Sequence, residues 1–174
     1  AEVIATIPRT SEAEVTVECN PDDVTIQMLR SFVDGGVNRV SIGVQSMSAH
    51  VLEALGRTHD RDNVAHAVDA VRAVGLETFN LDLIYGAAGE TVEDWQATVE
   101  GALALEPPHV SAYGLTVEAG TALAAQPGRH PDDDDQADKY EVAESRLSAA
   151  GLENYEVSNW AKPGHESRHN FLYW

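Results

Sequence analysis

The sequence predicts an α/β fold, an incomplete parallel (β/α) barrel followed by the start of a C-terminal accessory region. Two observations lead to this prediction. Short runs rich in Val, Ile, Leu, Phe and Tyr alternate with longer helical patterns, and such alternation indicates parallel strands joined by right-handed crossovers. Each apolar run also finishes on polar side chains, as in (β/α) barrels, whereas a doubly wound sheet gathers such groups at one switch point.

The expected strands are short, apolar and typical of a buried parallel sheet. They cover residues 15–20, 39–46, 78–85 and 109–117. Four strands are too few to close a barrel. We therefore expect the first strand to keep an unpaired edge.

The expected helices lie between these strands, at about residues 25–35, 48–55, 61–74 and 91–105. Thr25, Ser48 and Thr91 stand where N-caps belong, and Asp94 gives Thr91 the spacing of a capping box. Glycines, and the Pro107-Pro108 pair, stand where helices should end.

The pattern changes after Gly128. A helix is expected at residues 132–151, entered through an acidic cap, and a fifth strand at residues 154–161. We therefore predict a partial barrel over residues 1–128 and the beginning of an accessory region over residues 129–174.

The composition restricts the possible partners. A net charge of -18 over 174 residues argues against binding to nucleic acid or to anionic membranes, because both require clustered Lys and Arg. No apolar run approaches the length of a membrane span. Cys19 is the single cysteine, which rules out an internal disulfide and fits a reducing, cytoplasmic setting.

Four polar residues near strand ends form a coherent candidate site: Glu18, Gln45, Arg57 and Asp82. Two carboxylates suit ribose hydroxyls or an ammonium group, and Arg suits a carboxylate. The set predicts a zwitterionic, ribose-containing ligand. One alternative is that Glu18 and Asp82 form structural ion pairs with Arg39 or Arg57. Another is a hydrolase that uses the two carboxylates as general acid and base.

The last ten residues combine two histidines, His165 and His169, with three aromatic side chains, in a chain that is only 6% aromatic. This combination suits a flat, anionic, metal-bearing ligand, and a histidine beside aromatic groups is a reasonable heme ligand. A packed aromatic corner is the alternative.

Six motifs, in order, resemble the radical S-adenosylmethionine proteins related to oxygen-independent coproporphyrinogen III oxidase, and most closely the HemW-type heme chaperones. The resemblance covers essentially the whole chain. The motifs occupy residues 15–21, 37–46, 55–60, 80–86, 110–118 and 155–160.

This resemblance implies a partial (β/α)6 barrel, a [4Fe-4S] cluster and S-adenosylmethionine. Carried over by matching motif, the S-adenosylmethionine contacts are Glu18, Gln45, Arg57 and Asp82, with Thr116 as a further contact. The first four are the residues already selected by their chemistry.

The family's Cys-x3-Cys-x2-Cys cluster loop is missing from the sequence. One cysteine cannot supply three thiolates, and Cys19 stands where relatives commonly have Ala. We therefore expect no iron-sulfur ligands and no catalytic residue in this chain by itself. We expect it to be part of a longer protein that carries the loop upstream.

The segment His169-Asn-Phe-Leu-Tyr-Trp174 is similar to the His-Asn-x-x-Tyr-Trp element of the heme chaperones, whose histidine is associated with heme. The resemblance implies that the protein binds heme and delivers it to heme-accepting proteins. The alternatives are the S-adenosylmethionine-dependent oxidative decarboxylation of coproporphyrinogen III and, less closely, a barrel enzyme acting on a ribosylated metabolite. Because the element lies outside the predicted barrel, we expect heme and S-adenosylmethionine to occupy different sites.

Overall fold

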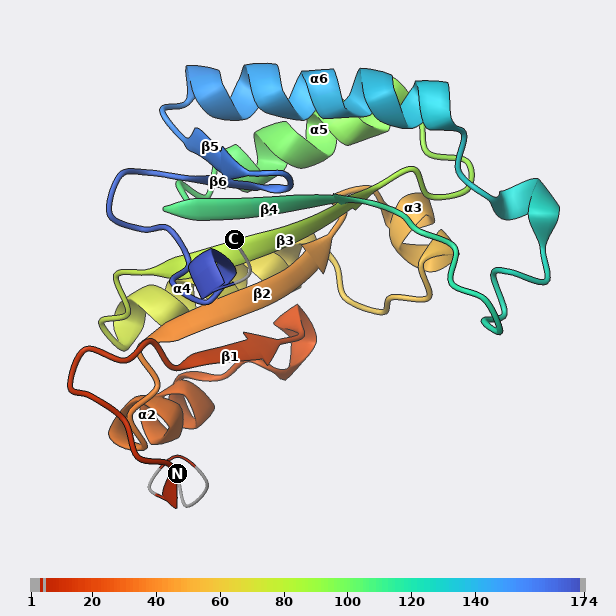
Figure 1. Cartoon of the computed structure of the whole chain (residues 1–174). Helices are drawn as coiled ribbons and strands as arrows, with labels where there is room; N and C mark the ends of the chain where they lie inside the picture. The colour runs from red at the N-terminus through yellow and green to blue at the C-terminus, as the bar shows by residue number, and fades with distance from the viewer. Residues whose placement is uncertain (1–3, 5, 173–174) are drawn as a thin grey trace.

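The computed structural model describes residues 4 and 6–172 and contains one six-stranded sheet in the order β1-β2-β3-β4-β6-β5 (Figure 1). The first four strands are parallel, as predicted. They are β1 (Thr16–Cys19), β2 (Arg39–Gln45), β3 (Phe79–Tyr85) and β4 (His109–Gly114). Among the described residues β1 forms one end of the sheet, so the predicted unpaired edge is confirmed.

The predicted crossover helices are also present: α2 (Ile26–Asp34), α3 (Ala49–Ala54), α4 (Arg61–Ala73) and α5 (Val92–Leu103). Thr25 caps α2 by accepting from the Met28 N–H, and Thr91 forms the expected capping box with Asp94. Ser48 stands at the N-cap position of α3, but its hydroxyl donates to Asp94 instead of capping the helix. Short 3₁₀ turns occupy Pro21–Asp23, Pro127–Arg129 and Asn170–Leu172 (η3).

The expected single strand at residues 154–161 is wrong. The chain forms a hairpin there, β5 (Glu153–Glu156) and β6 (Asn159–Ala161), after the helix α6 (Asp133–Ala149). The Asn154 amide donates to the Glu156 and Asn159 carbonyls and thereby stabilises the reversal. The hairpin also lets β6 pair antiparallel with β4, which extends the sheet.

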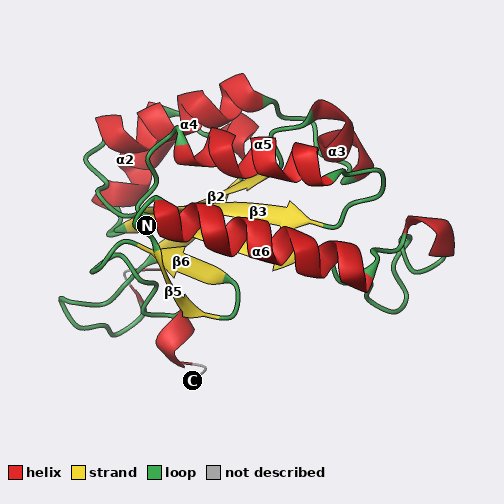
Figure 2. Cartoon of the chain, turned by 90° about the horizontal axis from the view of Figure 1, so that it is seen from above, coloured by secondary structure: helices red, strands yellow, loops and turns green. Residues whose placement is uncertain are grey.

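The two faces of the sheet differ in character because side chains alternate along each strand. One face lies under α2, α4 and α5 (Figure 2) and carries the buried apolar core. Its strand residues include Val40, Ile42, Leu81, Leu83 and Val110, none of which is exposed. The opposite face is polar and is crossed by the C-terminal segment. The predicted division at residue 128 remains a prediction.

A buried ion pair joins α6 to the loop between β3 and α5. The Lys139 Nζ lies 3.3 Å from the Glu90 Oε2, and both side chains are 0% exposed. The ammonium also contacts Asp135 at 2.6 Å and the Glu90 carbonyl at 2.9 Å, while the Gly86 N–H donates to Glu90. Burial raises the pKa of Glu90, and the contacts with Gly86 and Lys139 oppose that rise. The pair therefore holds the loop against α6.

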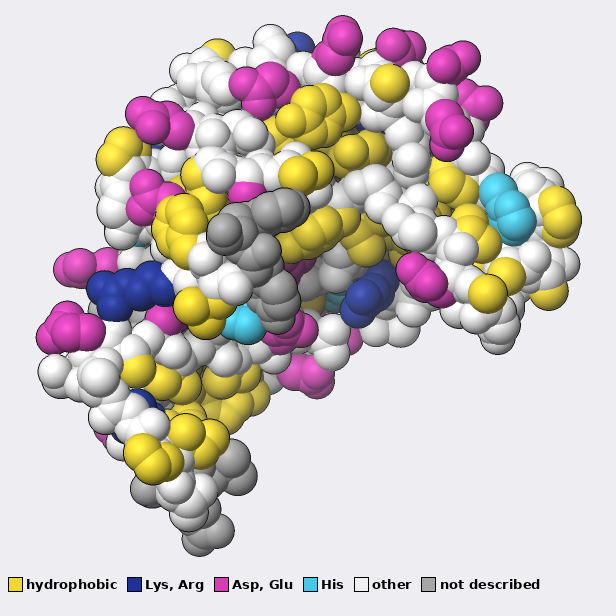
Figure 3. All heavy atoms as spheres, in the orientation of Figure 1, with side chains coloured by type: hydrophobic (Ala, Val, Ile, Leu, Met, Phe, Trp, Pro, Cys, Tyr) yellow, Lys and Arg dark blue, Asp and Glu magenta, His cyan; other side chains and the backbone are white. Residues whose placement is uncertain are grey.

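On the face shown in Figure 3, acidic side chains are spread over several parts of the chain, including α6. No helix in the described part of the chain is long and apolar enough to cross a membrane.

Candidate functional site

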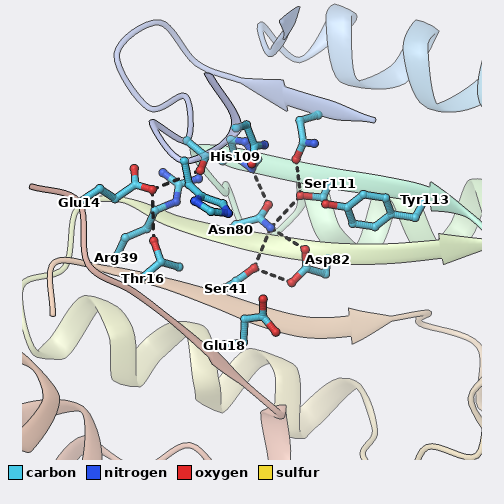
Figure 4. Close-up of a pocket in the computed structure, with 14 residues that line it drawn as sticks. Glu14, Thr16, Glu18, Arg39, Ser41, Asn80, Asp82, His109, Ser111 and Tyr113 are labelled. Carbon is cyan, nitrogen blue, oxygen red and sulfur yellow. Dashed lines mark hydrogen bonds between the residues drawn. The ribbon is translucent and has the colours of Figure 1, made fainter. Parts of the chain in front are cut away.

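The polar face of the sheet forms a cavity of about 320 Å³ (Figure 4). Alternate residues of four parallel strands point into it, and β6 together with the C-terminal segment, residues 165–172, completes its wall. The lining residues are Glu14, Thr16, Glu18, Arg39, Ser41, Asn80, Asp82, His109, Ser111, Tyr113, Asn159, Ser167, His169 and Asn170. This face corresponds to the interior of the partial barrel.

Asn80 lies at the centre of a hydrogen-bond network that crosses three strands. Its Nδ2 is 2.7 Å from the Asp82 Oδ1 and 2.8 Å from the hydroxyls of Ser41 and Ser111. Because an ionised carboxylate can only accept, the NH₂ of Asn80 must face Asp82, and its Oδ1 therefore faces His109. The network fixes the orientation of both side chains.

His109 is neutral in this network. Its Nδ1 lies 2.6 Å from the Asn80 Oδ1 and must donate, so its Nε2 accepts from the Tyr155 hydroxyl at 2.7 Å. Burial is the main cause that lowers the pKa of His109 to about 3, and Arg39 and His165 lower it further. His109 therefore serves as a fixed hydrogen-bonding group near neutral pH, in agreement with a structural role.

Glu18 and Asp82 place two carboxylates in the same cavity. Burial raises the pKa of Asp82, and the charge of Glu18 raises it further, whereas hydrogen bonds from Ser41 and Asn80 lower it. No ion pair joins Glu18 or Asp82 to Arg39 or Arg57, so the ion-pair alternative is wrong for these described residues. A cation or hydroxyl donor between the two carboxylates would relieve their repulsion. The pair thus suits a ligand that carries an ammonium group or hydroxyl groups.

The other three predicted contacts do not line this cavity. Gln45 ends β2, and Arg57 donates to the Asn20 amide oxygen just beyond β1, at 3.2 Å. Arg57 lines a separate cavity with His59 and other residues of the loop between α3 and α4. Thr116 is exposed two residues beyond the end of β4. All three lie near the carboxyl ends of the strands, where (β/α) barrels bind ligands.

Gln45 has an unusual backbone for a non-glycine residue, with φ of 62°. The register between β2 and β3 shifts between Gly43 and Gln45, as in a β-bulge. A Cβ at Gly43 would lie 2.8 Å from the Gln45 Nε2, so the glycine leaves room for this amide to fold back along the strand. Left-handed residues and bulges both concentrate at ligand sites, which supports a binding role for Gln45.

His169 lines the same cavity as Glu18 and Asp82. His169 thus lies on the cavity that holds two of the predicted S-adenosylmethionine contacts, and the expectation of separate sites for heme and S-adenosylmethionine stays a prediction. The sequence pattern placed His169 outside the barrel, but the C-terminal segment folds back across the polar face of the sheet (Figure 1). Glu14 holds it there by accepting from the Ser167 hydroxyl and the Arg168 N–H, at 3.2 and 3.1 Å.

The neighbourhood of His169 is partly apolar and open. Phe171 and Leu172 are 54% and 82% exposed, and the ring of Phe171 lies 5.5 Å from that of Tyr155. Tyr173 and Trp174, the other aromatic residues of the predicted element, lie outside the described residues. An exposed histidine beside exposed apolar groups suits a flat apolar ligand better than a closed core does.

Sequence reasoning missed several residues of the cavity, among them Arg39, Asn80 and Ser111. The available signal was the period of two within apolar strands, as in Asn80-x-Asp82 and His109-x-Ser111. Arg39 is 3% exposed, its Nη1 donates to the His165 carbonyl at 3.0 Å, and burial lowers its pKa. It therefore joins the start of β2 to the C-terminal segment.

The iron-sulfur cluster does not fit the residues of this chain. The sequence contains one cysteine, and burial raises the pKa of its thiol, which disfavours the thiolate that binds iron. Nowhere in residues 4 and 6–172 do three His, Cys, Asp or Glu side chains converge as metal ligands. We therefore assign no cluster chemistry to the residues of this chain.

Comparisons with known proteins agree with the fold and the motifs. The chain is 40% identical over 172 residues to the heme chaperone HemW of Escherichia coli (strain K12). The aligned region covers 99% of this chain and 46% of that protein. It is 45% identical over 167 residues to HemW of Mycobacterium tuberculosis (strain ATCC 25618 / H37Rv), covering 94% and 43%. The chain thus spans less than half the length of these relatives.

The solved structure of coproporphyrinogen III oxidase (HemN) from Escherichia coli, a radical SAM enzyme, is similar with a TM-score of 0.80 at 25% identity. The match covers 90% of this chain and 37% of that one, and it confirms the predicted incomplete barrel. The sequence profile of the radical SAM superfamily matches residues 1–102. By sequence and by fold, the chain belongs to the radical SAM superfamily.

Proposed function

We propose that this chain is part of a heme chaperone, a protein that binds heme and hands it to heme-accepting proteins in the cytoplasm. The observation that carries the proposal is the 40–45% identity, over nearly the whole chain, to proteins named heme chaperone HemW. The position of His169 on the cavity, beside the exposed Phe171 and Leu172, supports it.

His169 is the proposed heme ligand. Replacing it with Ala in the full-length protein should weaken heme binding at least roughly 10-fold and shift the Soret band, because an axial nitrogen is lost. Heme titration followed by absorbance measures both quantities. His66→Ala is the matched control, since His66 is exposed on α4, away from the cavity. An unchanged spectrum and affinity in the His169 variant would remove the assigned role.

Glu18, Gln45, Arg57, Asp82 and Thr116 are the proposed contacts to S-adenosylmethionine. When bound with the cluster of the complete protein, this cofactor is a source of radical chemistry; the residues of this chain would hold and orient it. Glu18 and Asp82 suit its ammonium or ribose, and Arg57 suits its carboxylate.

Glu18→Gln should weaken S-adenosylmethionine binding by roughly 10- to 100-fold, because a hydrogen bond to a charged acceptor is replaced by one to a neutral amide. Calorimetric titration of the full-length protein with its cluster measures this. Glu93→Gln, an exposed carboxylate on α5, is the control. Equal dissociation constants for the wild type and the Glu18 variant would exclude the contact.

The second candidate is oxygen-independent coproporphyrinogen III oxidase activity, which the structural match to HemN favours. The full-length protein, supplied with S-adenosylmethionine and a reductant, separates the two functions. The chaperone is expected to bind heme without decarboxylating coproporphyrinogen III. Turnover that depends on S-adenosylmethionine would reverse the assignment.

A further inference from the structure

The Tyr155 hydroxyl joins the floor of the cavity to the C-terminal segment. It lies 2.7 Å from the His109 Nε2, 3.2 Å from the Ser167 backbone nitrogen and 2.9 Å from the Asn170 Nδ2. Ser167 and Asn170 bracket His169 in the sequence. A single oxygen is therefore bonded to residues on both sides of this histidine.

The directions of these three hydrogen bonds are fixed by the groups that make them. A backbone N–H and an amide NH₂ can only donate, so the hydroxyl accepts from Ser167 and Asn170 with its two lone pairs. Its one proton then goes to the His109 Nε2, which is an acceptor because Asn80 holds the proton of the ring on Nδ1. The hydroxyl is saturated, because its one proton and both lone pairs are used in these three bonds.

The protonation states keep this arrangement intact near neutral pH. Burial raises the pKa of Tyr155, so the hydroxyl keeps its proton. The pKa of His109 is about 3, so the ring stays an acceptor. The ring of Tyr155 also lies 5.5 Å from both His109 and Phe171 and is held between them. The hydroxyl thus has a fixed position from which to orient the segment.

We propose that Tyr155 is a positioning residue for His169: its hydroxyl holds residues 167–170 against the His109–Asn80 network and so sets the direction in which His169 meets heme. This inference rests on the proposed heme-binding function and adds a residue that touches neither iron nor porphyrin. Tyr155 acts through His169 alone, so its effect must vanish when His169 is absent.

The test is a double-mutant cycle on heme binding by the full-length protein, with Tyr155→Phe, His169→Ala and both together. Tyr155→Phe keeps the ring and removes only the hydroxyl. It is expected to weaken heme binding by roughly 3- to 30-fold, the effect of losing one or two hydrogen bonds, and to move the Soret band toward that of the His169 variant. The double variant should bind heme as His169→Ala does.

Two further variants keep the cycle interpretable. Tyr140→Phe is the matched control, because Tyr140 lies on α6, packs beside Trp160 of β6 and does not line the cavity. Loss of its hydroxyl should leave heme binding unchanged. Asn170→Ala removes one of the two bonds on the segment side and should give a smaller effect in the same direction. It replaces Tyr155→Phe in the cycle if that variant does not fold.

The possible failures are distinguishable. If wild type and the His169 variant differ but Tyr155→Phe binds heme with wild-type affinity and spectrum, the positioning role is excluded and the proposed function stands. The same holds if the two substitutions weaken binding additively, since Tyr155 would then act independently of His169. If the wild-type protein does not bind heme, the proposed function fails, and the inference fails with it.

Discussion

Replacing Lys139 with Met is expected to lower the free energy of unfolding by about 3–5 kcal/mol. The substitution leaves the Glu90 carboxylate buried without its partner, and the Glu90 Oε1 already has no hydrogen-bond partner. Forming the pair requires the desolvation of two ions, so its net contribution to stability is small. The expected loss of stability therefore comes mainly from leaving the Glu90 charge buried and unpaired. Equilibrium unfolding in urea at pH 7 measures the difference.

Two other variants test this cause. Arg146→Met breaks the exposed pair between Arg146 and Glu100, whose side chains are 46% and 55% exposed, and should cost less than about 1 kcal/mol. Combining Lys139→Met with Glu90→Gln removes both charges and should recover much of the stability. Equal losses for Lys139→Met and Arg146→Met would show that burial of the pair has no energetic consequence.

Acidification from pH 6.5 to pH 5 is expected to cost the fold about 2 kcal/mol through His109 alone. The pKa of His109 is about 3 in the fold, against 6.5 ordinarily. Between these values the unfolded chain binds a proton that the folded chain does not, so stability rises with pH across this window. The full contribution is present above pH 6.5 and is lost progressively as the pH falls toward 3.

Urea unfolding at several pH values isolates this contribution when wild type is compared with His109→Gln. The variant is less stable at pH 7, because the network around Asn80 is disturbed, but its stability should depend less on pH. His66→Gln, at an exposed position, should keep the wild-type dependence. Parallel curves for wild type and His109→Gln would mean that His109 titrates alike in both states.

The sequence was sufficient to predict the parallel strands and the crossover helices. Their signals are local: buried apolar runs such as residues 79–85, and caps such as Thr91 with Asp94. The hairpin of β5 and β6 was missed because its residues form one continuous β-rich run. The reversal depends on the amide of Asn154, whose two carbonyl partners cannot be inferred from composition.

The candidate site was predicted in part. Glu18, Asp82 and His169 were singled out and lie on one cavity, but their common location depends on contacts between distant segments. The hydrogen bond from Ser167 to Glu14 joins residues 153 positions apart, and no local pattern reports it. The left-handed backbone of Gln45 was equally invisible, since a glutamine gives no sequence signal for positive φ.

The unpaired edge of β1 has a consequence for handling the protein. A row of free backbone N–H and C=O groups can pair with any strand that is offered, including β1 of another copy. A preparation of residues 1–174 alone is therefore expected to self-associate and to aggregate on refolding. A further strand paired with β1 would block such contacts. Completing the barrel would therefore also reduce aggregation.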